Sequence, residues 1–129
     1  MASYPTNLRY TKDHEWARLN GAIATIGITA FAKDQLGDVV YLELPEPGTQ
    51  VKRGEPFGVV ESTKAVSELF APLSGKIIKV NKALVDAPEG INDDPHEAGW
   101  MVEIQIASEA ELSELLDAAA YEKLVAEAH

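Results

Sequence analysis

The chain has 129 residues, 21 of them acidic and 11 basic, which gives a formal net charge of −10. A surface this negative repels nucleic-acid phosphates and anionic lipid, so we expect neither nucleic acid nor a membrane as a partner. No apolar run approaches the roughly 20 residues of a membrane span, and the lack of cysteine excludes disulfides, thiolate metal sites and a cysteine nucleophile. No targeting signal is visible near the start, which predicts a cytoplasmic location; a mature mitochondrial form would look the same.

The first half of the chain has the alternation and β-branched content of β-strands. Two such runs flank Asn20 and Gly21, a dipeptide that strongly favours a hairpin turn. A short helix is predicted at residues 30–36, with Thr29 as its N-cap and Gly37 in the left-handed conformation that often ends a helix.

More strands and a helical tail are predicted after this helix. Residues 86–95 have the composition of an irregular connection. Ser108 and Glu111 form the pattern of a capping box, and Asp117 can cap a second segment, so C-terminal helices are expected near residues 108–127. The further strands are expected around residues 39–44, 57–60, 66–70, 76–80 and 100–106.

The middle of the chain contains a weak internal repeat. Residues 37–43 resemble residues 75–81 at an offset of 38, and residues 57–60 resemble residues 100–103 at an offset of 43. Two similar β units in the same order indicate approximate two-fold symmetry. The predicted fold is therefore mainly β, a single domain built as a flattened two-sheet barrel or sandwich with a short helix and a helical tail.

Lys64 is the residue whose position points to chemistry. It lies between two apolar runs within residues 54–72, so we expect it at the tip of a β-hairpin, near the midpoint of the repeat. A tip projects the ammonium into solvent, which is what a covalent attachment point visited by several enzymes requires. A solvated turn lysine with no function is the alternative, and the neighbouring residues favour attachment.

Those neighbours resemble the lipoyl attachment hairpin of lipoyl and biotinyl domains. The resemblance is carried by residues 61–65 (ESTKA), by Ala71 and Pro72, and by Gly75. It implies a fold of the lipoyl/biotinyl type.

Most of the chain also resembles the glycine cleavage system H protein family. The two clear departures are Thr63, where the family commonly has Val, and Glu68, where Asp is frequent. The segments that carry the resemblance are residues 10–16, 24–29, 35–38, 44–48, 54–58, 91–92, 99–100 and 116–118.

The family resemblance implies that Lys64 carries lipoate as N6-lipoyllysine, which supplies the sulfur that the chain lacks. It implies a non-catalytic, swinging-arm carrier of glycine catabolism and one-carbon metabolism. Such a carrier moves the aminomethyl group of glycine from a pyridoxal-phosphate-dependent glycine decarboxylase to a tetrahydrofolate-dependent aminomethyltransferase, and dihydrolipoamide dehydrogenase then reoxidises the arm. A lipoate-attaching enzyme is a further partner, with Glu61 as its expected recognition residue. The carrier is expected to be a monomer.

The resemblance also implies a cleft that protects the loaded arm. Asp13, Glu15 and Glu68 match the positions that hold its amine, because a protonated amine attracts carboxylates. Asp13 is about equally well explained as a surface charge. Glu15 is the better candidate, because it is expected inside a strand, where an unpaired carboxylate is unfavourable and therefore indicates a functional role.

Other functions agree less well with the sequence. A lipoyl domain of a 2-oxoacid dehydrogenase or a biotin carrier would have Asp-Lys-Ala or Met-Lys-Met at the tip and no C-terminal helices. A lipoyl-relay protein, which donates lipoate to other apo-proteins, would use the same lysine and stays open. His14, His96 and His129 lack metal-ligand spacing, so no metal site is expected, and His14 is expected at a sheet edge.

Overall fold

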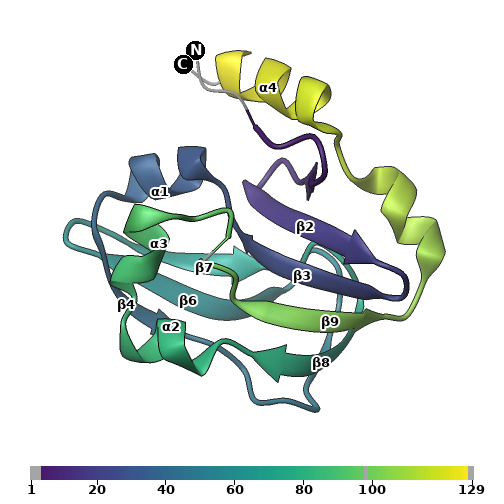
Figure 1. Ribbon diagram of the computed structural model, residues 1–129, viewed down its shortest axis with the longest axis horizontal. Coiled ribbons are helices and arrows are strands. Elements are labelled where there is room, and N and C mark those ends of the chain that lie inside the picture. Colours follow the sequence, from purple (N-terminus) through teal and green to yellow (C-terminus); the bar gives the residue numbers. More distant parts are fainter. Residues whose placement is uncertain (1–3, 98, 128–129) are drawn as a thin grey trace.

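Two antiparallel sheets form the body of the computed structural model, which describes residues 4–97 and 99–127 (Figure 1). The larger sheet has the strand order β1-β2-β3-β9-β8-β5, and the smaller sheet has the order β4-β6-β7. The larger sheet comprises β1 (Arg9–Tyr10), β2 (Glu15–Asn20), β3 (Ile23–Ile28), β9 (Val102–Ile106), β8 (Gly75–Val80) and β5 (Gln50–Val51). The smaller comprises β4 (Val39–Glu43), β6 (Pro56–Ser62) and β7 (Val66–Phe70).

Four α-helices and a 3₁₀ segment complete the described chain. They are α1 (Ala30–Leu36), α2 (Lys82–Asp86), α3 (Glu89–Asp93), the 3₁₀ segment η1 (Glu109–Glu114) and α4 (Ala118–Glu127). In Figure 1, α4 lies at one end of the molecule beside the N-terminal segment, and the backbone N–H of Tyr4 donates to the Glu122 carboxylate there (3.1 Å). Within the described residues, no helix has the length and apolar character needed to cross a membrane.

The main hydrophobic core lies between the two sheets, because alternate side chains of both point inward. Each fully buried aliphatic side chain contributes roughly 1.5–3 kcal/mol. A second, aromatic cluster lies under α4 and contains Tyr4, Tyr10, Trp16 and Tyr121. The two sheets stay separate, so the predicted sandwich is confirmed and the closed barrel is not.

The predicted repeat is visible in the strand pairing. β4 pairs with β6 and β8 pairs with β9, and the register shifts at matching places, 38 residues apart, in β4 and β8. Val60 lies opposite Leu42, whereas Val102 lies opposite Val80. The second strands are therefore related by 42 residues, and the predicted offset of 43 is wrong. Because a one-residue shift exchanges the two faces of a strand, the corrected offset matches buried Val60 with buried Val102.

The first hairpin is confirmed with its turn one residue later than predicted. Asn20 pairs with Ile23, so Gly21 and Ala22 form the connection. Gly21 has a φ of 61°, a conformation that glycine adopts without steric cost.

Residues 86–95 are not irregular, because they include the end of α2 and all of α3. Both helices have five residues, which is too short for a clear helical period. Asn81 caps α2 by accepting from the N–H of Leu84 (3.3 Å).

The capping box is also wrong. Ser108 makes no side-chain capping bond, and the Glu111 carboxylate instead accepts from the N–H (2.6 Å) and hydroxyl (2.8 Å) of Ser74. A long-range contact thus replaces the local one, and the segment becomes a 3₁₀ helix. The cap of α4 is confirmed, since Asp117 Oδ1 accepts from the N–H of Ala120 (2.8 Å).

Candidate functional site

Lys64 is exposed at the tip of the β6–β7 hairpin. Ser62 builds the turn: its N–H donates to the Ala65 carbonyl (2.8 Å), and its Oγ accepts from the N–H groups of Ala65 (3.0 Å) and Lys64 (3.3 Å). The turn therefore does not use the Lys64 side chain, whose ammonium is left accessible.

The tip is fastened to the connection between α1 and β4. The N–H of Thr63 donates to the carbonyl of Asp38 (3.1 Å). A β-carbon placed on Gly37 would lie 3.4 Å from Cε of Lys64, so the lysine stem passes directly over this glycine. Gly37 has φ 85° and ψ −157°, which is an extended positive-φ conformation nearly exclusive to glycine rather than the left-handed helical one predicted.

Glu61 lies on the outer face of the smaller sheet, three residues before Lys64. In register it lies between Tyr41 on β4 and Val66 on β7. Tyr41 and Val66 are 45% and 69% exposed, so the carboxylate interrupts an accessible apolar row beside the lysine. Among the described residues Glu61 forms no ion pair.

A cleft of about 390 Å³ opens between α1 and the edge strand β7. All three predicted acids, Asp13, Glu15 and Glu68, line it, although they come from the turn before β2, from the start of β2 and from β7. Apolar walls accompany the acids, from Ile28, Phe31, Leu36, Val60 and Leu69. The sequence prediction therefore names residues that the fold brings together.

Glu15 is the buried acid of this cleft, with 3% exposure. One carboxylate oxygen accepts from Thr11 Oγ (2.8 Å) and the other from the N–H of Phe70 (3.3 Å). Burial outweighs these hydrogen bonds and raises the pKa of Glu15 to about 8. None of the ion pairs among the described residues includes Glu15: they are Arg18–Glu97, Lys33–Asp34 and Arg53–Glu114. A buried carboxyl without a protein cation is suited to a cationic ligand.

Asp13 and Glu68 are exposed, so they lie at the rim of the cleft rather than inside it. The N–H of Asp13 donates to Thr11 Oγ (3.2 Å), which holds the turn. The rim acids add negative potential at the entrance, while Glu15 places a buried carboxyl inside the cleft.

His14 is a residue of the cleft that the sequence analysis assigned to a sheet edge. It lies in the turn before β2 with a φ of 71°, and its ring packs on Phe31 of α1 (centroids 4.6 Å apart). Its Nδ1 is 2.8 Å from the hydroxyl of Tyr121, and burial lowers the pKa of His14, which favours the neutral ring. No local pattern could reveal this role, because Tyr121 is 107 residues away.

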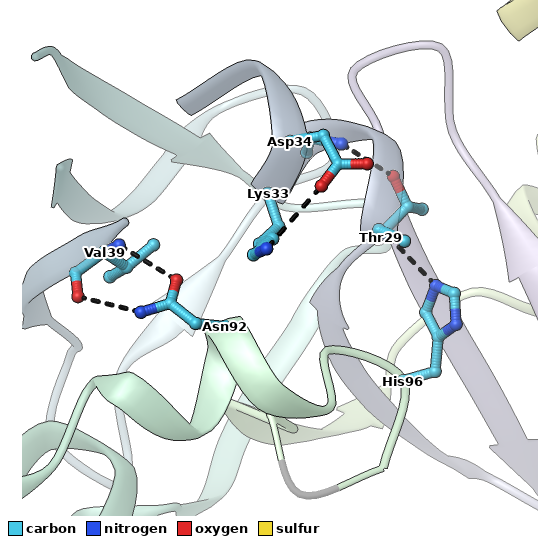
Figure 2. A network of polar contacts seen from close by, with 8 residues as sticks. Thr29, Lys33, Asp34, Val39, Asn92 and His96 are labelled. Carbon is cyan, nitrogen blue, oxygen red and sulfur yellow. Dashed lines mark hydrogen bonds and ion pairs between the residues drawn. The ribbon is translucent and has the colours of Figure 1, made fainter. Parts of the chain in front are cut away.

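Two side chains from the segment after α2 hold the ends of the α1 region (Figure 2). His96 Nε2 accepts from the N–H of Ala30 at the start of α1 (3.1 Å). Asn92 bonds the N–H (3.0 Å) and the carbonyl (3.4 Å) of Val39, where β4 begins. His96 thus accepts a hydrogen bond from the first turn of α1 and has a structural role there. In the described part of the chain no three His, Asp or Glu side chains form a possible metal site, and His129 lies outside that part.

A two-sheet sandwich with an exposed lysine at a fastened hairpin tip defines a class: the lipoyl/biotinyl type of carrier domain. The sequence model of the family described as "Glycine cleavage H-protein" matches residues 8–128. The chain therefore belongs to this family.

Individual relatives agree with this assignment. The chain is 62% identical over 123 residues to the glycine cleavage system H protein of Anaeromyxobacter sp. (strain K), with 95% of this chain and 96% of the relative covered. It is 53% identical over 127 residues to that of Symbiobacterium thermophilum, with 98% and 99% covered. A crystal structure of a glycine cleavage system H protein from Mycobacterium marinum has a TM-score of 0.85 and 44% identity, covering 93% of this chain and 97% of that one. The predicted family is confirmed, and it supports the shuttle role in the glycine cleavage system.

Proposed function

We propose that this chain is the lipoyl carrier of a glycine cleavage system and that the ε-amine of Lys64 forms the amide with lipoate. When bound, lipoate supplies the sulfur pair on which the aminomethyl group of glycine travels. The observation that carries the proposal is the placement of Lys64 at an exposed, fastened tip whose following strand leads to an acidic cleft.

The residues of the chain fit a tethered group of this kind. β7 runs from the tip to Phe70, beside Glu15, and its four residue steps span about 13 Å at the rise of a strand. Gly37 leaves room for the lysine stem on the side of α1, the helix that forms the opposite wall of the cleft. A cargo tethered to Lys64 can therefore be delivered to Glu15 along β7.

The cleft retains the amine of the cargo through Glu15. The positive charge of the amine lowers the pKa of the adjacent Glu15 carboxyl and favours its ionised form. The pair then forms a charge-assisted hydrogen bond, which is about twice as strong as a neutral one. Asp13 and Glu68 attract the same charge at the rim. Without the aminomethyl group the arm carries no cation and is released from the cleft. The presence of this one small group therefore selects between an arm bound in the cleft and a free arm.

The proposed partners are the glycine decarboxylase, the aminomethyltransferase, dihydrolipoamide dehydrogenase and the lipoate-attaching enzyme. The chain supplies the attachment point, the cleft and recognition, and its partners supply the catalysis. We place it in the cytoplasm as a monomer.

Intact-mass measurement of protein from a lipoate-competent host tests the attachment site. The wild type is expected to show the lipoyl mass shift, and Lys64→Arg is expected to lose it while keeping its melting temperature. Lys76→Arg is the matched control, because Lys76 is likewise exposed but lies within β8 rather than at a hairpin tip. A lipoyl shift that survives in Lys64→Arg would refute the assignment.

A further inference from the structure

We propose that Tyr121, on the C-terminal helix α4, is a positioning residue for the cleft. Its hydroxyl fixes the corner at which α1 leaves β3 and so holds the helical wall of the cleft in place. This inference rests on the proposed retention of the amine and extends it to a helix of which no described residue lines the cleft.

The hydroxyl of Tyr121 joins two separate elements of the cleft. The residue is fully buried, and its Oη lies 2.8 Å from His14 Nδ1 and 2.7 Å from Thr29 Oγ. His14 belongs to the turn that contains Asp13 and directly precedes Glu15, the first residue of β2. Thr29 caps α1, and its Oγ accepts from the N–H of Ala32 (3.2 Å).

Both contacts lead to side chains that line the cleft. The His14 ring, oriented by Tyr121, packs on Phe31, and the Thr29 hydroxyl holds the first turn at Ala32. Phe31 and Ala32 are cleft residues. The Tyr121 hydroxyl is therefore connected to the α1 wall of the cleft twice, through His14 and through Thr29.

α1 is the wall most sensitive to such an anchor, because it has no fully buried residue. Four of its side chains, Ala30, Phe31, Ala32 and Leu36, are only partly buried against the two hydrophobic clusters, so hydrogen bonds contribute a larger share of what holds this helix in place. At this corner the Tyr121 hydroxyl bonds Thr29 Oγ, the N–H of Ala30 donates to His96 Nε2, and the N–H of Thr29 donates to the carbonyl of His14 (3.0 Å).

The ring of Tyr121 has its own support, so the hydroxyl can be tested alone. It stacks on Tyr10 (centroids 4.6 Å apart, planes at 10°) and meets the edge of Tyr4 (5.0 Å). Tyr121→Phe keeps these contacts. Tyr10→Phe is the matched control: it removes a hydroxyl from the same cluster, but that hydroxyl donates to the carbonyl of Pro5 (2.6 Å), which is not a cleft residue.

The first measurement uses the unmodified chain in NMR titrations. Tyr121→Phe is expected to shift the amide resonances of residues 11–15 and of α1 and to move the titration of His14. Tyr10→Phe is expected to leave the resonances of α1 and the titration of His14 unchanged, although both variants lose a buried hydrogen bond and some stability.

The second measurement is the spontaneous loss of the aminomethyl group from loaded, lipoylated protein. We expect Tyr121→Phe to accelerate it between about threefold and tenfold, the effect of one net hydrogen bond, with the rate of lipoate attachment unchanged. Tyr10→Phe is expected to match the wild type. Thr29→Val removes the other partner of the hydrogen bond between Thr29 and Tyr121. It is expected to resemble Tyr121→Phe and provides a second variant if the first folds poorly.

Equal loss rates in Tyr121→Phe and Tyr10→Phe would overturn the positioning role, as would resonance shifts spread over the whole chain. Glu15→Gln separates this failure from failure of the proposed cleft. If Glu15→Gln accelerates the loss and Tyr121→Phe does not, only the role of Tyr121 is wrong. If neither does, the retention function itself is wrong.

Discussion

The hairpins β2–β3 and β6–β7 have similar lengths but different tips. A β-carbon added to Gly21 in the first would meet no described atom within 4 Å, so that tip extends into open space. The second tip is tied to Asp38 through Thr63, and its Lys64 stem lies on Gly37. A tip that only connects strands needs no support, whereas the fastened tip holds Lys64, the proposed attachment point, in a fixed position.

The strands of the two hairpins also differ in their surroundings. β3 lies between β2 and β9 inside the larger sheet, whereas β7 is an edge strand beside the cleft. The hairpins meet where Glu15, the first residue of β2, accepts from Phe70, the last residue of β7. This junction gives the most sensitive tests of the difference between the two hairpins.

The largest expected effect is on the pH dependence of stability. The pKa of Glu15 rises from an ordinary value near 4.5 to about 8 on folding, so the folded state holds a proton that the unfolded state releases. This contribution is fully present below about pH 4.5 and is lost as the pH rises toward 8. Between pH 5.5 and pH 8, Glu15→Gln is expected to gain about 3 kcal/mol relative to the wild type in urea unfolding.

The same comparison removes the contribution of the histidines. Burial lowers the pKa values of His14 and His96, which favours stability above the unfolded-state pKa near 6.5 and loses it at lower pH. Both side chains are present in the wild type and in the variant, so their effect cancels in the difference. Identical pH profiles for the two proteins would show that Glu15 ionises normally.

The second effect is on retention at the junction. Loaded protein with Glu15→Gln is expected to lose the aminomethyl group about tenfold faster, because an amide cannot replace a carboxylate opposite a cation. Lipoate attachment should be unaffected. Glu43→Gln, an exposed acid on β4, controls for the loss of one negative charge. A wild-type loss rate in Glu15→Gln would mean that the arm is not protected by this residue.

The third effect compares the two glycines directly. Gly37→Ala is expected to cost about 2 kcal/mol, because its backbone conformation is almost restricted to glycine, and Gly21→Ala about 1 kcal/mol. Only Gly37→Ala should also slow lipoate attachment, since the new methyl group contacts the Lys64 stem and the strained backbone disturbs the connection to which the tip is fastened. Equal attachment rates in the two variants would show that Gly37 does not support Lys64 during lipoate attachment.

The smallest effect concerns the outer face of the β6–β7 hairpin. Glu61→Gln is expected to lower kcat/KM of lipoate attachment about threefold, with an unchanged melting temperature, because it removes a charge from the accessible row beside Lys64. Glu43→Gln, on the same face but farther from the tip, should have less effect. Unchanged attachment kinetics would make Glu61 an ordinary solvated acid.

The sequence by itself determined the local architecture and the family. Strand alternation, the turn around Gly21 and the caps at Thr29 and Asp117 depend on residues within four positions of one another, so they can be read from spacing. The position of Lys64 at a tip follows from the apolar runs on either side. The resemblance named the three acids of the cleft before the fold brought them together.

Only the tertiary structure decided the contacts between distant residues. Glu111 accepts hydrogen bonds from Ser74 instead of pairing with Ser108. The strand register sets the offset of the second repeat strands at 42 residues rather than the predicted 43. Two five-residue helices occupy much of the segment that was expected to be irregular. The contact between His14 and Tyr121 joins residues 107 positions apart, and that between Tyr121 and Thr29 joins residues 92 apart. Such hydrogen bonds form because the packed core places the donors and acceptors side by side, a proximity that spacing along the chain does not encode.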